Sequence, residues 1–157
     1  MSVTSGLPKY ILSGLEATPV VLIELLHGQS EATYDKRPDP ERFSLREVIC
    51  HLADWEGVWL ERMQRVASEE NPELPGYDEG QWAIDHNYKE ANAIEQIDKF
   101  TEGRKSIVAF LSELPAEEWQ RTGIHSQWGA ISILSLATLV IGHDGYHTKQ
   151  IVEWLNA

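Results

Sequence analysis

The chain has 157 residues, 42% of them hydrophobic, and its 25 Asp and Glu against 13 Lys and Arg give a formal charge of −12. This length predicts one domain, residues 1–157, and the negative charge argues against nucleic acid or an anionic membrane as a partner. A single cysteine, Cys50, excludes an internal disulfide and a zinc–cysteine cluster. The first ten residues lack a secretion signal, and no apolar stretch reaches the roughly 20 residues of a membrane span, so we expect a cytoplasmic protein.

Apolar residues three or four positions apart dominate the chain, and no alternating strand pattern is evident, so four helices are predicted. The first runs from about Pro8 to His27. Pro19 predicts a kink inside it, with Thr18 able to cap the half that follows. The charged, proline-containing stretch 28–43 predicts a loop.

The second helix has the clearest start signal. Ser44 and Glu47 match the S-x-x-E capping box, in which each side chain accepts a backbone N–H that the helix leaves free. This helix should end near Glu69. The long connection over 71–90 is typical of a crossover or of a loop that covers a substrate.

The third helix is predicted from about Lys89 to Leu114, where Pro115 ends it, and residues 116–119 can form one more turn. Residues 121–130 predict a loop. The fourth helix runs from about Ser132 to Asn156.

Two histidines of the fourth helix, His143 and His147, lie on its apolar stripe. Residues four apart share one helix face, so both imidazoles can bind one metal ion. His51 borders the apolar stripe of the second helix, and an antiparallel pairing of these helices would bring it to a similar height. Three imidazoles leave a tetrahedral ion with the open position that catalytic zinc sites need. The alternative, three core histidines held by hydrogen bonds without a metal, stays open.

Three segments carry a resemblance to a known family: FSLREVICHLADWEGVWLERM, GIHSQWGAIS and HDGYHTKQI, in this order. Together they resemble the DinB superfamily, with its YfiT-like metalloenzymes. The resemblance implies an all-α, four-helix bundle with up-down-down-up topology. It also implies a divalent metal held by one histidine of the second helix and two of the fourth, which are His51, His143 and His147 in this chain. Zinc is the first expectation for the metal and nickel the second.

The resemblance also suggests a reaction, because characterised relatives include thiol-dependent S-transferases and a thiol-dependent isomerase. The leading hypothesis is a metalloenzyme that transfers a low-molecular-weight thiol to a small electrophile or performs related detoxification chemistry. A metal-dependent hydrolase and a non-catalytic metal- or ligand-binding stress-response bundle are the alternatives. The expected partner is a small-molecule substrate, with a homodimer as an option.

Two carboxylates lie next to the predicted ligands in sequence. Asp54 follows His51 by three residues, and Asp144 follows His143 directly. Metal-bound histidines are usually oriented by a hydrogen bond to the second ring nitrogen, which either carboxylate could accept. The alternative is that both are solvated residues of a helix surface.

Other side chains near the predicted site have two interpretations each. Gln150 can bind a ligand histidine or the substrate, or can end the core stripe of the fourth helix. His125 in the loop before that helix can contact the substrate or be exposed. Cys50 is more typical of a small buried side chain than of a ligand or nucleophile.

Overall fold

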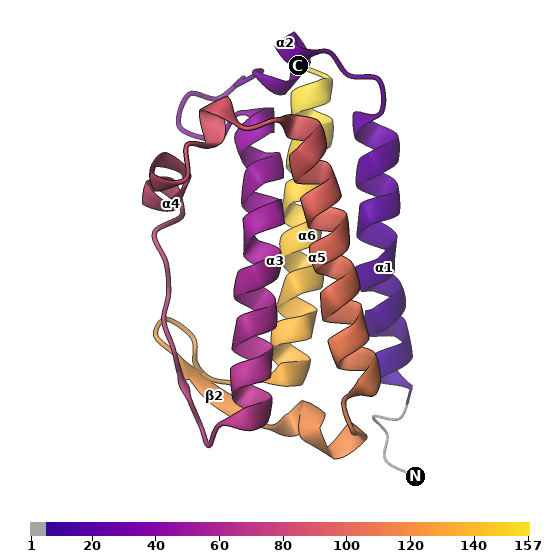
Figure 1. Cartoon of the computed structure of the whole chain (residues 1–157), viewed down its shortest axis with the longest axis vertical. Helices are drawn as coiled ribbons and strands as arrows, with labels where there is room; N and C mark the ends of the chain where they lie inside the picture. The colour runs from indigo at the N-terminus through magenta and orange to yellow at the C-terminus, as the bar shows by residue number, and fades with distance from the viewer. Residues whose placement is uncertain (1–5) are drawn as a thin grey trace.

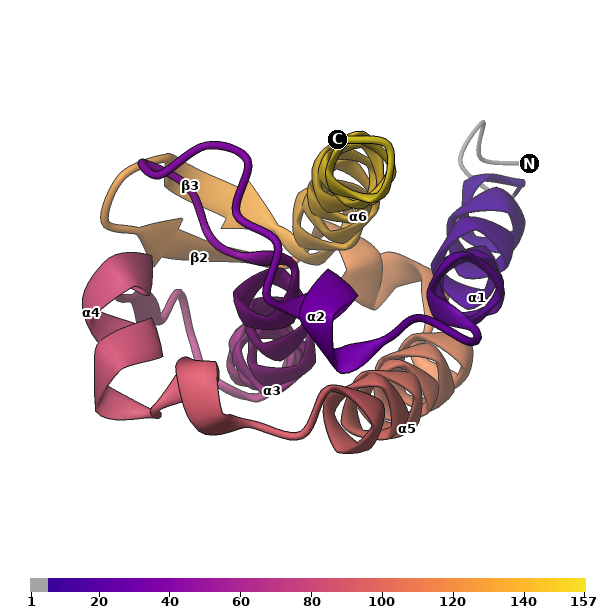
Figure 2. The ribbon, with the colours of Figure 1, turned by 90° about the horizontal axis from the view of Figure 1, so that it is seen from above.

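The computed structural model describes residues 6–157, and four long helices form its frame (Figure 1). They are α1 (Leu7–Leu26), α3 (Leu45–Ser68), α5 (Ala93–Glu113) and α6 (Ile133–Leu155). The chain runs up α1, down α3 and α5, and up α6, so the predicted up-down-down-up, all-α bundle is confirmed. Seen from above, α1 and α3 lie at opposite corners, and α5 and α6 each contact both of them (Figure 2).

A long crossover makes α3 and α5 run in the same direction. It contains the short strand β1 (Glu73–Leu74), the helix α4 (Glu79–Asp85) and the 3-10 turn η1 (Tyr88–Glu90). Helix α4 packs on α3 at the side of the bundle (Figure 2). The predicted start of the third helix at Lys89 was four residues early, because the side chain of Asn92 caps α5 by accepting a backbone N–H.

The loop predicted over residues 121–130 is instead part of a small sheet. Residues 122–132 form a hairpin of β2 (Thr122–His125) and β3 (Gly129–Ser132), and β1 pairs parallel with β2. Strands of two to four residues are too short for an alternating pattern to stand out. The hairpin lies beside the lower end of α3 and follows the 3-10 turn η2 (Ala116–Gln120), which agrees with the predicted extra turn (Figure 1).

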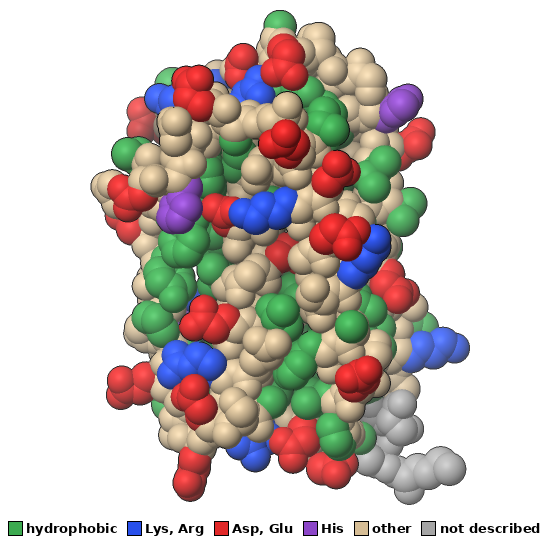
Figure 3. Space-filling model, viewed as in Figure 1, with side chains coloured by type: hydrophobic (Ala, Val, Ile, Leu, Met, Phe, Trp, Pro, Cys, Tyr) green, Lys and Arg blue, Asp and Glu red, His purple; other side chains and the backbone are tan. Residues whose placement is uncertain are grey.

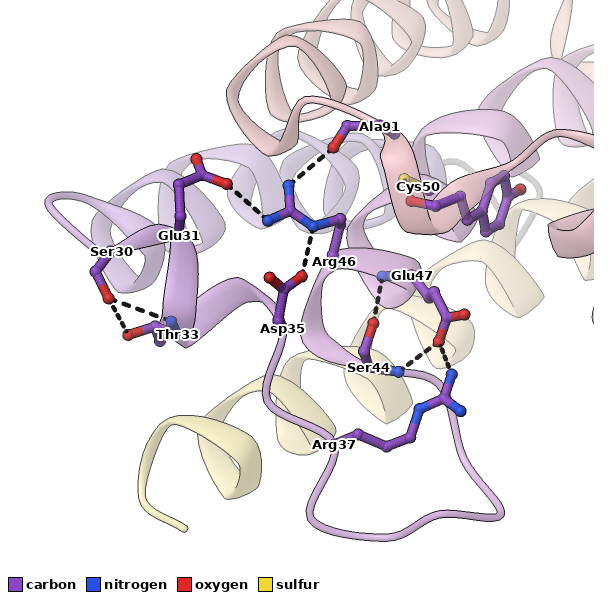
Figure 4. Close-up of polar contacts among 11 residues, drawn as sticks. Ser30, Glu31, Thr33, Asp35, Arg37, Ser44, Arg46, Glu47, Cys50 and Ala91 are labelled. Carbon is purple, nitrogen blue, oxygen red and sulfur yellow. Dashed lines mark hydrogen bonds and ion pairs between the residues drawn. The ribbon is translucent and has the colours of Figure 1, made fainter.

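The capping box at the start of α3 is present as predicted. Ser44 Oγ accepts the backbone N–H of Glu47 at 3.2 Å, and Glu47 Oε2 accepts that of Ser44 at 2.8 Å (Figure 4). Arg37 donates to the same carboxylate. These bonds fix the first turn of α3, seven residues before His51.

The neighbouring Arg46 joins three segments. Its guanidinium donates to Glu31 at 2.7 Å, to Asp35 at 2.8 Å and to the carbonyl oxygen of Ala91 at 2.8 Å (Figure 4). Glu31 belongs to the one-turn helix α2 (Glu31–Tyr34), which lies inside the predicted loop. Arg46 therefore holds this loop and the end of the crossover against the top of α3.

Helix α1 continues through Pro19. The residue before it, Thr18, makes a contact with α6 that the sequence did not indicate. The hydroxyl of Thr18 donates to Asp144 at 2.6 Å, so the expectation that Thr18 caps a second half of the helix was wrong.

The surface carries the negative charge in dispersed form. Acidic side chains are scattered over the face in Figure 3, with basic ones between them. Within the described residues, none of the helices combines the length and apolar character needed to cross a membrane.

Candidate metal centre

Three imidazoles converge inside the bundle. His51 comes from α3, and His143 and His147 from α6, which packs antiparallel to α3. One ring nitrogen from each residue can be chosen so that all three lie within 4.8 Å of one another. The Nε2 atoms of His51 and His143 are 2.9 Å apart.

This spacing fits a shared metal ion. Nitrogens about 2.0–2.1 Å from one ion are about 2.9 Å apart at a right angle and about 3.3 Å apart at a tetrahedral angle. In the metal-free protein the same 2.9 Å is a hydrogen bond between the Nε2 atoms of His51 and His143, and the convergence of His147 on this pair is what favours a metal.

Burial keeps the three rings neutral. Desolvation, followed by repulsion from the other two histidines, lowers the pKa of His51 to about 2. Desolvation, followed by the charges of His147 and Arg104, lowers the pKa of His143 to about 3, and desolvation also lowers that of His147. Neutral imidazole is the form that binds metal ions, so the site is ready for a cation at physiological pH.

Gln150 orients one of the ligands. Its side-chain oxygen lies 3.0 Å from His147 Nδ1, and both residues are buried. When Nδ1 carries the proton and donates it to this oxygen, the lone pair of Nε2 is free to bind a metal. Of the two interpretations of Gln150, the structure therefore supports contact with a ligand histidine.

The two acidic residues named from the sequence are engaged elsewhere. Asp54 accepts hydrogen bonds from Trp82 Nε1 at 2.9 Å, from the Tyr88 hydroxyl at 2.8 Å and from Lys99. It thereby fastens α4 and η1 to α3. Asp144 is bound by Arg104 on the other side of α6. Neither carboxylate is hydrogen-bonded to an imidazole of the cluster.

His125 is buried, so the exposed alternative does not hold. Its ring stacks on Trp128 with centroids 3.9 Å apart, and its Nδ1 accepts the backbone N–H of Gln127. Cys50 is buried against the carbonyl oxygen of Tyr88, and desolvation raises the pKa of its thiol to about 12. Cys50 is also absent from the group of side chains whose ligand atoms converge, so the structure supports its interpretation as a small buried side chain.

One carboxylate near the cluster was missed. Glu79 Oε2, at the start of α4, lies 4.0 Å from His51 Nε2. It is the only carboxylate that the described residues bring within 4.0 Å of the three imidazoles. It is one of 25 acidic residues and falls in a predicted connection, so no spacing signal distinguished it.

Aromatic rings line the cluster on the side of α4. The Trp55 ring lies 4.4 Å from that of His51, and the Trp59 ring 5.6 Å from that of His143. Trp82 of α4 lies 5.1 Å from Trp55. These rings limit the access of water, and a small organic molecule could pack on them.

Comparison with known proteins agrees with this geometry. The model of the DinB superfamily matches residues 15–151. The chain belongs to the DinB superfamily. The family resemblance predicted from the sequence is thus confirmed.

Two similar proteins from Oceanobacillus iheyensis carry the name "Putative metal-dependent hydrolase". One, OB0413, is 25% identical over 111 residues, which cover 69% of this chain and 62% of the relative. The other, OB0782, is 30% identical over 113 residues, covering 71% of this chain and 64% of the relative. The matched part is therefore less than two thirds of each relative.

Two solved structures share the fold. YfiT from Bacillus subtilis, described as "a probable metal-dependent hydrolase with an unusual four-helix bundle topology", matches with a TM-score of 0.90 at 22% identity, covering 98% of this chain and 89% of YfiT. A Streptococcus pneumoniae protein matches with a TM-score of 0.69 at 16% identity, covering 94% of this chain and 89% of that one. At these identities the likeness shows the fold alone.

Proposed function

We propose that this protein is a divalent-metal-dependent hydrolase that acts on a small molecule. The observation that carries the proposal is the convergence of three neutral imidazoles, two of them buried and that of His143 partly buried, with a carboxylate and aromatic rings beside them. The names of the two Oceanobacillus relatives support it. Imidazole suits zinc and nickel alike, so zinc first and nickel second remain our expectations.

The residues of the chain would divide the work. His51, His143 and His147 would hold the metal, and Gln150 would orient the ring of His147. A divalent metal supplies Lewis acidity, which polarises a substrate oxygen and makes water more acidic. Glu79 would serve as the general base for the attacking water, and Trp55 and the neighbouring aromatic rings would exclude bulk solvent.

Thiol-dependent S-transfer, the leading hypothesis from the sequence, has no specific support in the described residues. A Lewis acid can lower the pKa of a thiol as well as that of a water molecule. Thiol transfer is therefore the competing outcome of the functional test. The small-molecule substrate, the cytoplasmic location and the homodimer stay predictions.

The first experiment measures bound metal and folding in the wild type and His147→Ala. The wild type should bind a divalent ion, and His147→Ala should lose it while its circular dichroism still shows most of the helix content. Full metal occupancy in His147→Ala would contradict the assigned ligands.

The second experiment screens esters, amides and phosphoesters, each with and without glutathione, bacillithiol or mycothiol. Turnover in water alone is expected, and Glu79→Gln should retain metal but lose about 10²- to 10⁴-fold in rate. Glu61→Gln, which alters an exposed carboxylate of α3, is the matched control. Turnover only in the presence of a thiol would replace the hydrolase by the transferase.

A further inference from the structure

Three nitrogen atoms outside the histidine cluster are buried without a hydrogen-bond partner among residues 6–157. They are Trp59 Nε1, Arg62 Nε and His125 Nε2, on residues that are 3%, 6% and 2% exposed. An unpaired buried polar group costs about 1–3 kcal/mol and is rare in folded proteins. Three of them in one part of the molecule indicate that something absent from the chain itself completes their bonding.

All three atoms are donors. Tryptophan and arginine nitrogens donate only. In His125 the Nδ1 atom accepts the backbone N–H of Gln127 at 3.1 Å, so the single proton of the neutral ring is on Nε2. Burial, helped by the charge of Arg62, lowers the pKa of His125 and keeps the ring neutral. The missing partner must therefore supply acceptors.

Trp59 and Arg62 lie one turn apart on α3. The guanidinium carbon of Arg62 is 5.3 Å from the centroid of the Trp59 ring. Its Nη2 donates to the carbonyl oxygen of Pro75 at 2.9 Å, which ties the arginine to the segment just after β1.

That segment also contacts the hairpin that carries His125. Leu74 is the strand partner of His125, and the backbone N–H of Gly76 donates to Ser126 Oγ at 2.9 Å. An added Cβ at Gly76 would lie only 3.0 Å from that oxygen, so glycine permits the close approach. The three residues thus lie around the junction of α3, the 74–76 segment and β2.

Arg62 also lacks a counter-charge. Each of the six other arginines has a carboxylate within 4.0 Å, whereas Arg62 has none among the described residues. Glu61 and Glu79 act on this guanidinium only at longer range, so its place for a direct ion-pair partner is open to an anion.

The donors lie close to the candidate metal centre. The centroid of the Trp59 ring is 5.6 Å from that of His143, and the same ring also lies against the Arg62 guanidinium. Half-exposed aromatic rings flank the junction: Tyr77, 5.7 Å from that guanidinium, and Trp128, stacked on His125.

We propose that Trp59, Arg62 and His125 bind an oxyanion, a carboxylate or a phosphate, of the substrate whose reacting bond lies at the histidine cluster. The substrates would then be small organic anions. The assignment of this anion to a substrate rests on the proposed hydrolase function, but the binding of the anion does not.

The test uses the full chain freed of metal, so that anions cannot bind a metal ion and no hydrolysis occurs. Succinate, inorganic phosphate and neutral succinamide are titrated while NMR follows the indole N–H of Trp59, assigned with Trp59→Phe. Arg62→Met is compared with Arg65→Met, which removes the same charge one turn further along α3 from an arginine paired with Glu69. His125→Phe keeps an aromatic ring on Trp128 and removes the Nε2 donor.

We expect succinate or phosphate to shift the Trp59 signal and succinamide to leave it unchanged. The anion that binds with the higher affinity shows whether the site prefers a carboxylate or a phosphate. Arg62→Met should weaken binding about tenfold or more, and Arg65→Met less than about twofold. Should Arg62→Met fail to fold, weaker binding by folded His125→Phe supports the proposal. Any one of four results would overturn the proposal. Neither anion shifts the Trp59 signal, or succinamide shifts it equally. Alternatively, His125→Phe binds the anion as tightly as the wild type, or folded Arg62→Met binds it as tightly as Arg65→Met. A failed hydrolysis screen would leave this result untouched.

Discussion

Two polar clusters lie on either side of α6 in the same bundle core. His143 and Asp144 are adjacent in sequence, and the 100° turn between successive helical residues directs them differently. His143 meets His51 of α3, whereas Asp144 accepts two hydrogen bonds from Arg104 of α5, at 2.6 and 2.8 Å. One helix turn therefore contributes to both clusters.

The Arg104 cluster satisfies itself. All five N–H groups of the guanidinium are used: two bind Glu56, two bind Asp144, and one binds the carbonyl oxygen of Leu15. With Thr18 also donating to Asp144, the cluster joins all four long helices. Gly103 allows the close approach, because a Cβ there would lie 2.7 Å from that of Glu56.

The histidine cluster and the neighbouring donors do not satisfy themselves. Partners are missing among the described residues for His51 Nδ1 and for one nitrogen each of Trp59, Arg62 and His125, and the Nε2 atoms of His51 and His143 lie 2.9 Å apart. Complete internal bonding serves stability, and incomplete bonding marks the places where a metal or a ligand is expected. The following predictions test this difference.

The largest effect should come from Arg104→Met. It leaves two carboxylates buried without a counter-charge, which should lower the free energy of unfolding by about 3–5 kcal/mol in urea titrations of the metal-free protein. The triple variant E56Q/R104M/D144N should lose less, because no unpaired charge remains. If Arg104→Met were as stable as the wild type, the Arg104 cluster would not be what holds the four helices together.

Gln150→Leu tests the orientation of the metal ligand. Losing the acceptor for His147 Nδ1 should weaken metal affinity about 10- to 100-fold in competition with a chelator. Gln150→Glu, which keeps an acceptor at this position, should retain most of the affinity. Unchanged affinity in Gln150→Leu would remove Gln150 from the site.

Acid should destabilise the metal-free protein through the histidines. The folded pKa values of His51 and His143, about 2 and about 3, lie below the ordinary 6.5, so only the unfolded chain takes up these protons as the pH falls below 6.5. Stability should therefore be unaffected above about pH 7.5. By pH 5.5 it should fall by about 1.4 kcal/mol for each of these histidines. Urea titrations of wild type and H51L/H143L at both pH values check this, and an equal loss in the two proteins would contradict it.

The smallest effect on stability should come from His51→Leu. At pH 7.5 this change removes a buried, unpaired Nδ1 and fills the space with an apolar side chain, so the metal-free protein should stay within about 1 kcal/mol of wild type or become more stable. Metal binding should be lost. A loss of stability as large as that of Arg104→Met would erase the distinction between the two clusters.

Local signals predicted the long helices well. The Ser44–Glu47 capping box starts α3 as expected, and the apolar stripes place the other three helices within a few residues of their bounds. The short strands and α4 escaped detection, because elements of two to seven residues are held by the bundle next to them more than by their own pattern. Glu79 and Arg62 therefore could not be connected to the site from sequence.

The sequence by itself determined which residues form the four long helices and that His143 and His147 share one face, because helix periodicity is a local property. The sequence also indicated that His51 could face inward at a similar height, and the resemblance to the family supported it as the third ligand. Only the tertiary structure decided that Asp144 faces Arg104, that Glu79 lies beside His51, and that Trp59, Arg62 and His125 keep unpaired donors. Those facts depend on contacts between distant segments, and the packing of the whole chain sets them.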